Sequence, residues 1–204
     1  MRLVPIVLVA TSSCWAHRLD EYLQATMFSV AQDRIEAQIR LTPGVAVFPF
    51  VMASIGEDRN AYAERVLRDL SLSVDGVRLR LALVSVKFPA LEEMREGLGE
   101  IQIDFRASVP AGGSNRTLVF ENHHQSAIAA YLVNALVPRD PAIRLVAQTR
   151  SENQSTYRLD YTQEGARPMS GEAVLIAAAV LLVASRFAYP ASRWTMAIKA
   201  RMRS

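Results

Sequence analysis

Apolar residues occupy every second position in several segments of the chain. The clearest segments are Arg34 to Leu41, Val77 to Phe88, Ile101 to Val109 and Thr156 to Tyr161. Successive side chains of a strand point to opposite faces, so this alternation predicts strands with one buried face and one face exposed to solvent. Less regular stretches add further candidates, namely Tyr22 to Val30, Thr117 to Glu121, Tyr131 to Leu136 and Ile143 to Thr149.

Turn residues separate many of these candidate strands. Asp75-Gly76, Ala111 to Gly113 and Ser151 to Asn153 each carry the glycine, aspartate or asparagine that tight turns favour. Eight or more short strands at this spacing predict a mainly β fold. We expect an immunoglobulin-like antiparallel β-sandwich across residues 17–162.

Two other segments depart from the alternation. Asn60 to Leu70 repeats its apolar residues with a helical period, and Asp58 or Asn60 stands where an N-cap is expected. Pro43 to Ile55 is strongly apolar, but Pro49 would break a long helix, so this segment predicts a core-packed turn or a short helix. We therefore expect one or two short helices beside the sandwich.

The first sixteen residues have the layout of a secretory signal peptide. A basic second residue is followed by the apolar run Leu3 to Ala10, and small residues stand at Cys14 and Ala16. Cleavage after Ala16 would make His17 the first residue of the mature chain. A lipoprotein signal through Cys14 is less favoured, because Thr11 stands where such signals usually carry an aliphatic residue. Since Cys14 is the only cysteine, the mature chain would have neither a disulfide nor a thiolate nucleophile.

A charge-free run, Ala173 to Ser185, lies near the C-terminus and continues past Arg186 to Tyr189. At ~1.5 Å per residue, residues 173–189 would cover about 25 Å, slightly less than a hydrocarbon core of about 30 Å. We expect a single transmembrane helix there, joined to the sandwich by a linker at residues 163–172. The alternative is a buried helix of the folded domain.

Several basic residues and no acid follow this run. Positive charge stays on the cytoplasmic side of a membrane, so residues 190–204 are expected to form a basic cytoplasmic tail. This topology predicts a single-pass protein of the bacterial inner membrane, with its N-terminal domain in the periplasm.

The basic tail also explains the net charge of the chain. Lysine and arginine total 23 and the acids total 20. One basic residue lies in the leader and five follow Ser185, which leaves 17 (23 minus 1 minus 5) against 20 acids in residues 17–185. The exported domain is therefore slightly acidic, and we expect no nucleic-acid partner.

Three histidines are the main candidates for metal chemistry. His17 would carry a free α-amine beside its own imidazole, and His123 and His124 are adjacent. Neighbouring side chains in an extended backbone point to opposite faces, so one of the adjacent pair would join His17 at a shared centre. With Asp20 or Glu21 as an oxygen donor, this set would suit Ni(II) or Cu(II). Alternatively, His17 is a solvated terminus and the other two histidines form a polar corner that binds loop backbone.

Motifs of common enzymes are absent from the sequence. It has no Gly-x-Ser-x-Gly elbow, phosphate loop, His-Glu-x-x-His or Gly-x-Gly-x-x-Gly. The acidic residues on the alternating strands are explained more simply as part of the solvent-exposed face than as catalytic acids. We therefore expect a protein that is not an enzyme, and a secreted hydrolase is the least favoured hypothesis.

Five segments carry a likeness to a known family. They are AHRLDEYLQAT (16–26), RIEAQIRLTPG (34–44), AYAERVLRDLSLSVDG (61–76), FENHH (120–124) and AAYLVNALVPRDPAI (129–143). Together they resemble the extracytoplasmic N-terminal domain of bacterial membrane proteins related to the HupE/UreJ nickel-uptake accessory group. Such relatives often carry a calcium-type loop, for which residues 54–60 are too short. They also carry a multi-helix membrane part, where this chain has one predicted helix.

Two hypotheses follow from the residues and the resemblance. In the first, the chain is a membrane-anchored periplasmic accessory domain that handles Ni(II) or Cu(II) for a membrane partner such as a transporter. In the second, it is a metal-free structural or interaction domain that docks another protein of the cell envelope.

Overall fold

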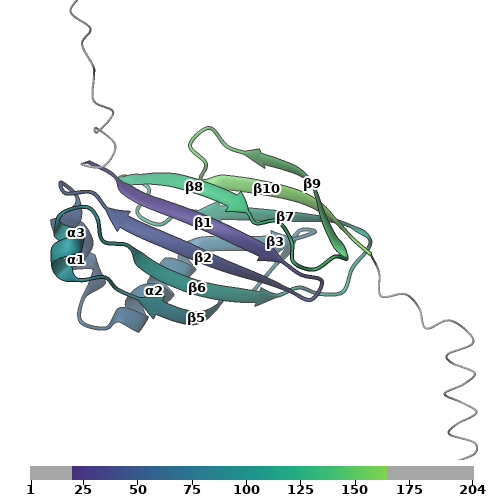
Figure 1. The fold of residues 1–204 in the computed structure, drawn as a ribbon, viewed down its shortest axis with the longest axis horizontal. Coiled ribbons are helices and arrows are strands. Elements are labelled where there is room, and N and C mark those ends of the chain that lie inside the picture. Colours follow the sequence, from purple (N-terminus) through teal and green to yellow (C-terminus); the bar gives the residue numbers. More distant parts are fainter. Residues whose placement is uncertain (1–19, 165–204) are drawn as a thin grey trace, which may run out of the picture. The chain divides into compact units, whose positions relative to one another are not determined.

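Ten strands and three helices make up residues 20–164, the part of the chain that the computed structural model describes (Figure 1). The strands are β1 (Tyr22–Val30), β2 (Arg34–Pro43), β3 (Leu70–Val74), β4 (Val77–Arg78), β5 (Ala82–Lys87), β6 (Ile101–Ser108), β7 (Asn115–Asn122), β8 (Ala129–Ala135), β9 (Ile143–Arg150) and β10 (Thr156–Gln163). The helices are α1 (Phe48–Ile55), α2 (Arg59–Arg68) and α3 (Leu91–Arg95). The fold is mainly β, as the alternation predicts.

The strands form two five-stranded sheets. Sheet A has the order β5-β6-β2-β1-β8, and sheet B has the order β4-β3-β7-β10-β9. Figure 1 shows sheet A in front of the fainter strands β3, β7 and β10 of sheet B. The sheets meet through aromatic side chains: the Phe28 ring of sheet A lies 4.9 Å from that of Phe120 and stacks at 6.0 Å on that of Tyr157. The hydrophobic core therefore lies between the two sheets.

Alternation decides which residues enter this core. On β2 the side chains of Ile35, Ile39 and Leu41 are almost fully buried, while Glu36, Gln38 and Arg40 are half-buried or exposed. β6 repeats the pattern, with Ile101 and Phe105 buried. The predicted strands Arg34 to Leu41 and Ile101 to Val109 are thus confirmed as strands with one face in the core.

One strand pair runs against the expectation of an antiparallel sandwich. β1 and β8 are parallel, from Tyr22 opposite Ala129 to Phe28 opposite Ala135. The chain leaves sheet B after β7 and enters sheet A beside the start of β1, where the Tyr22 N–H donates to the Ile128 carbonyl. The prediction of wholly antiparallel pairing is wrong here, because a half-buried strand shows the same alternation in either direction.

The predicted strand Val77 to Phe88 is in fact two strands. β4 lies at the edge of sheet B, β5 lies at the edge of sheet A, and residues 79–81 connect them. The crossover between the two sheets interrupts a segment in which the alternation continues without a break from Val77 to Leu83. This connection forms one wall of the site described below.

The helices pack at the ends and edge of the sandwich. α1 has Pro49 in its first turn, where proline is tolerated, and remains short. Asp58 caps α2 by accepting hydrogen bonds from the Asn60 and Ala61 amides, so the predicted N-cap is confirmed. α2 packs on β5 and β3 and ends at Arg68, two residues before the predicted end. α3 is a third helix beyond the one or two expected.

None of the helices within residues 20–164 is long and apolar enough to cross a membrane. The predicted signal peptide (1–16), linker residues 165–172, the transmembrane helix (173–189) and the basic tail (190–204) lie outside the described residues.

Candidate functional site

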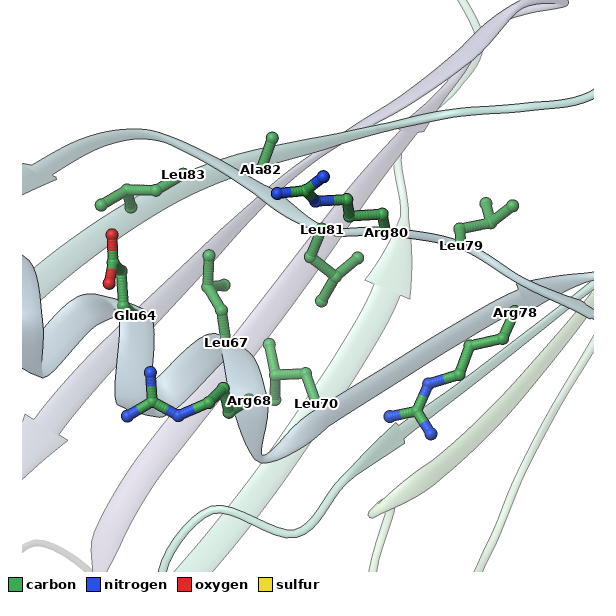
Figure 2. Close-up of a pocket in the computed structure, with 10 residues that line it drawn as sticks. All are labelled: Glu64, Leu67, Arg68, Leu70, Arg78, Leu79, Arg80, Leu81, Ala82 and Leu83. Atoms are coloured by element: carbon green, nitrogen blue, oxygen red, sulfur yellow. The ribbon is translucent and has the colours of Figure 1, made fainter.

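A groove of about 640 Å³ lies between α2 and the connection from β4 to β5 (Figure 2). One wall is α2 with the start of β3, and the other is the continuous stretch from Arg78 to Leu83. Figure 2 shows Leu67 and Leu70 pointing from the first wall toward Leu81 on the second. The lining residues are Glu64, Leu67, Arg68, Leu70, Arg78, Leu79, Arg80, Leu81, Ala82 and Leu83.

Leucines form the floor of the groove because two different periods bring them together. On the connection, Leu79 is buried and Leu81 and Leu83 are half-buried, whereas the residues between them are exposed, as in a strand. On α2, the helical period buries Leu67 and leaves the next residue, Arg68, exposed. The floor is therefore apolar and the rim is polar.

Three arginines on the rim have no internal partner. Within residues 20–164, the guanidinium groups of Arg68, Arg78 and Arg80 form no ion pair, hydrogen bond or stacking contact, whereas Arg34 and Arg158 pair with carboxylates. Glu64 is the only carboxylate in the lining, and it forms no ion pair with them.

Free guanidinium groups over an apolar floor define what the groove can bind. A guanidinium presents a planar fork of donors that matches a carboxylate and remains charged at any physiological pH. The leucines between the walls offer apolar area to the uncharged part of the same ligand. The groove therefore suits a ligand that combines negative charge with apolar side chains.

A second polar cluster surrounds His124 in the protein interior. Its imidazole is 4% exposed, and Nδ1 lies 2.7 Å from Asp69 Oδ2 at the end of α2. Nε2 lies 3.5 Å from the hydroxyl of Tyr62, which in turn lies 2.6 Å from the hydroxyl of Tyr22. A carboxylate only accepts, so Nδ1–H donates to Asp69 and Nε2 is left as the acceptor for the Tyr62 O–H.

Amide side chains hold the backbone around this histidine. Gln24 donates from Nε2 to the His124 carbonyl at 2.8 Å, and its Oε1 accepts from Asn122 Nδ2 at 2.9 Å. Asn122 Oδ1 accepts from the His124 amide, and the Tyr131 hydroxyl donates to the His124 carbonyl at 3.3 Å. Buried polar groups need such partners, so this network fixes the loop that connects β7 to β8.

Burial sets the protonation of the network. It lowers the pKa of His124 below its ordinary value, and the hydrogen bond that His124 donates to Asp69 opposes that shift only in part. Burial also raises the pKa of Tyr62 to about 12. Both side chains are therefore neutral near pH 7, which suits a network that stabilises the interior.

The two adjacent histidines point to opposite sides, as predicted. His123 is exposed, with Nε2 3.3 Å from Glu121 Oε2, while His124 is buried in the network above. Asp20 is exposed just before β1, and Glu21 is half-buried next to it. His17 lies outside the described residues.

The start of β1 and the histidine loop lie at the same end of sheet A. The Tyr22 N–H donates to the Ile128 carbonyl at 2.7 Å, and the Tyr22 ring stands edge-on to His124 with centroids 6.0 Å apart. In residues 20–164, no three side chains of histidine, cysteine, aspartate or glutamate come together as a group that could hold a metal ion. His124, one of the predicted metal ligands, is buried, and its ring nitrogens instead contact Asp69 and Tyr62.

The groove is the feature that the sequence interpretation missed. The alternation predicts Arg78 and Arg80 on the solvent-exposed face of a single strand, and the helical period predicts Arg68 on the solvent-exposed face of a helix. The three residues line one groove only because α2 packs beside the crossover. The one sequence cue is the alternation of arginine and leucine from Arg78 to Leu81.

Comparisons with protein-family models, curated proteins and solved structures found no match to this chain. The resemblance to the HupE/UreJ group therefore stays an expectation from the residues quoted above.

Proposed function

We propose that this chain is a binding module of the bacterial cell envelope that docks a partner protein in the groove between α2 and the β4–β5 connection. The observation that carries the proposal is the set of three unpaired arginines, Arg68, Arg78 and Arg80, over a floor of leucines. Arginine is enriched among the residues that dominate interface energies, and a recessed apolar floor shields its contacts from water.

Charge supports this assignment. Internal carboxylates neutralise several arginines of the described domain, for instance Arg116 with Asp75, but leave the groove arginines free although residues 17–185 are acidic as a whole. The positively charged groove attracts an acidic partner, whereas the rest of the acidic domain repels it. An acidic partner is therefore favoured at the groove over other parts of the surface. The groove thus contributes orientation as well as affinity.

The proposal includes the topology expected from the sequence. We propose that the two sheets are an immunoglobulin-like sandwich held in the periplasm, with residues 173–189 as a transmembrane anchor in the inner membrane. The resemblance to the HupE/UreJ group supports a partner that is itself a membrane protein. The enclosed position of His124 supports a structural role for its network, since a 4% exposed imidazole offers little surface to a substrate.

Site-specific photo-crosslinking tests the docking proposal. A photoreactive residue at Ala82, in the groove, is compared with one at Thr149, which is exposed on β9 at the far edge of sheet B. In the full chain in its native membrane, the Ala82 probe is expected to capture one partner protein. That product should vanish when the three groove arginines become glutamine.

The matched control replaces three other exposed arginines by glutamine, Arg95, Arg139 and Arg144. This variant should keep the crosslinked product. Two results would contradict docking in the groove. One is that the probes at Ala82 and Thr149 give the same crosslinked products, and the other is that the Ala82 product persists in both triple variants.

Handling of a transition metal is the second candidate function. It is favoured by the hydrogen bond between Tyr22 and Ile128, which holds the start of β1 beside the end of the loop that contains His123. Tyr22 is the fifth residue after His17, and an extended chain spans at most about 17 Å over that length. His123, Asp20 and Glu21 are the described donors at this end of the sheet.

Calorimetric titration of the full chain with Cu(II) and with Ni(II) tests this candidate. Tight binding should be lost in His17→Ala and weakened in His123→Ala, and it should weaken below neutral pH because the amine must be deprotonated. His124→Ala is expected to change stability more than affinity. Equal, weak binding by all variants would leave docking as the function.

A further inference from the structure

The wall of the groove contains an unpaired stretch of extended backbone. β4 and β5 lie at the edges of the two sheets, and the connection between them belongs to neither. The Leu79 N–H donates to the Leu72 carbonyl at 2.8 Å. Beyond it, the backbone of Arg80 and Leu81 forms no hydrogen bond with the backbone of any other described residue. This stretch therefore offers free backbone donors and acceptors between the edge strands of the two sheets.

Side chains on either side of this backbone alternate in chemistry. Arg78 and Arg80 are exposed, while Leu79 is buried, Leu81 is half-buried, and both line the groove with Leu67. A segment that lies beside an extended backbone presents its own side chains with the same period of two. One face of such a segment would meet the arginines and the other would meet the leucines.

We propose that the groove takes an extended acidic segment of the partner protein, which adds as a short strand beside Arg80 and Leu81. Its carboxylates pair with Arg68, Arg78 and Arg80, and its alternate apolar side chains lie on the leucine floor. Main-chain hydrogen bonds give affinity in strand addition, and the alternate side chains give specificity. This inference rests on the proposed docking function and specifies its partner.

The shape of the groove favours a peptide over a lipid surface. The leucines lie between two walls, and Leu79 and Leu67 are buried at 8% and 7% exposure. A single chain can enter such a recess, whereas a flat bilayer surface reaches mainly the rim. Free backbone groups also have no counterpart on an anionic lipid headgroup, but they match those of a strand.

Fluorescence anisotropy with defined peptides tests the inference on the full chain in mild detergent. The probe is a labelled eight-residue peptide of alternating glutamate and leucine. Its controls are the lysine and leucine counterpart and the glutamate peptide with N-methyl groups at every second residue, which removes backbone donors. We expect saturable binding of the glutamate peptide with a Kd below about 1 mM.

The variants separate charge from strand pairing. The affinity for the glutamate peptide should fall by about 2- to 5-fold in each of Arg68→Gln, Arg78→Gln and Arg80→Gln. The control Arg144→Gln should leave this affinity unchanged. The N-methylated peptide should bind at least about tenfold more weakly. The lysine peptide should show no saturable binding.

Three results would overturn the inference. Equal affinity for the N-methylated and parent peptides would show charge pairing without strand addition. Arginine-dependent binding to phosphatidylglycerol vesicles, with no binding of the glutamate peptide, would assign the groove to lipid. A third result is that the glutamate peptide does not bind while the crosslink at Ala82 still depends on the arginines. This result would support the docking function but contradict the proposal that the partner binds through an extended acidic segment. Loss of both peptide binding and crosslink would remove both proposals.

Discussion

The imidazole of His124 and the carboxylate of Asp69 lie 2.7 Å apart, 55 residues apart in sequence. Asp69 ends α2, and His124 belongs to the loop that carries the chain from sheet B to sheet A. The backbone repeats this link, because the His123 N–H donates to the Asp69 carbonyl at 3.0 Å. The pair therefore fixes the end of one groove wall to the interior of the sandwich.

This pair predicts a pH-dependent stability. Burial keeps the folded-state pKa of His124 below the value of ~6.5 in the unfolded chain, so between the two values the unfolded state binds more protons. The contribution of the neutral imidazole is fully present above about pH 6.5. It is lost as the pH falls from there through the lowered folded-state pKa.

Urea unfolding of the full chain in mild detergent between pH 7 and pH 5 measures this effect. The wild-type free energy of unfolding should fall more steeply than that of His124→Gln, by at most about 1.4 kcal/mol per pH unit. His123→Gln, the exposed neighbour, should keep the wild-type slope. Parallel curves for wild type and His124→Gln would mean that the buried imidazole does not control the loop.

The two faces of β6 predict very different costs of substitution. Phe105 is 2% exposed in the core, whereas Gln102 is half-buried and bonds Glu100 at the edge of the strand. Phe105→Ala should lower the free energy of unfolding by about 3 to 5 kcal/mol, because it leaves a cavity. Gln102→Ala should change it by less than about 0.5 kcal/mol. Similar losses in urea unfolding would contradict the assigned core face.

Gly99 predicts a steric effect that Gly113 does not share. A Cβ at Gly99 would lie 2.6 Å from the backbone nitrogen of Met94, while one at Gly113 would meet nothing within 4 Å. Gly99→Ala should cost about 1 to 3 kcal/mol, because the backbone after α3 must shift. Gly113→Ala should be neutral or slightly stabilising. Thermal unfolding of both variants checks this, and equal midpoints would rule out close packing at Gly99.

Alternation along the sequence was sufficient to predict most of the core. It placed Ile35, Ile39 and Phe105 inside because a strand with one buried face leaves a period of two in the sequence. It also predicted that adjacent histidines diverge, as His123 and His124 do. These outcomes depend on local backbone geometry alone.

Features that depend on tertiary placement could not be predicted in the same way. The parallel pairing of β1 with β8 and the crossover at residues 79–81 leave the local alternation unchanged. The helical period predicts Leu70 at the end of a helix, but pairing with Asn122 makes it the first residue of β3. The partner of His124 is a residue from another element, and the arginines line one groove only after α2 has packed. Long-range packing decides each of these.

The predicted anchor can be tested by reporter fusions. The sequence predicts a signal peptide, an acidic exported domain and a basic tail. The two ends of residues 162–204 are therefore expected on opposite sides of the membrane. A reporter active only outside the cytoplasm should work when fused after Tyr161 and fail when fused after Ser204. Equal activity at the two positions would contradict a single-pass anchor.

The affinity of the full chain for the partner captured at Ala82 tests the central claim most directly. Isothermal titration compares the wild type with the Arg68, Arg78 and Arg80 glutamine variant and with the control variant at Arg95, Arg139 and Arg144. If the groove is the docking site, the groove variant binds at least about tenfold more weakly, and the control stays within about twofold of the wild type. Equal affinities for all three proteins would contradict the claim.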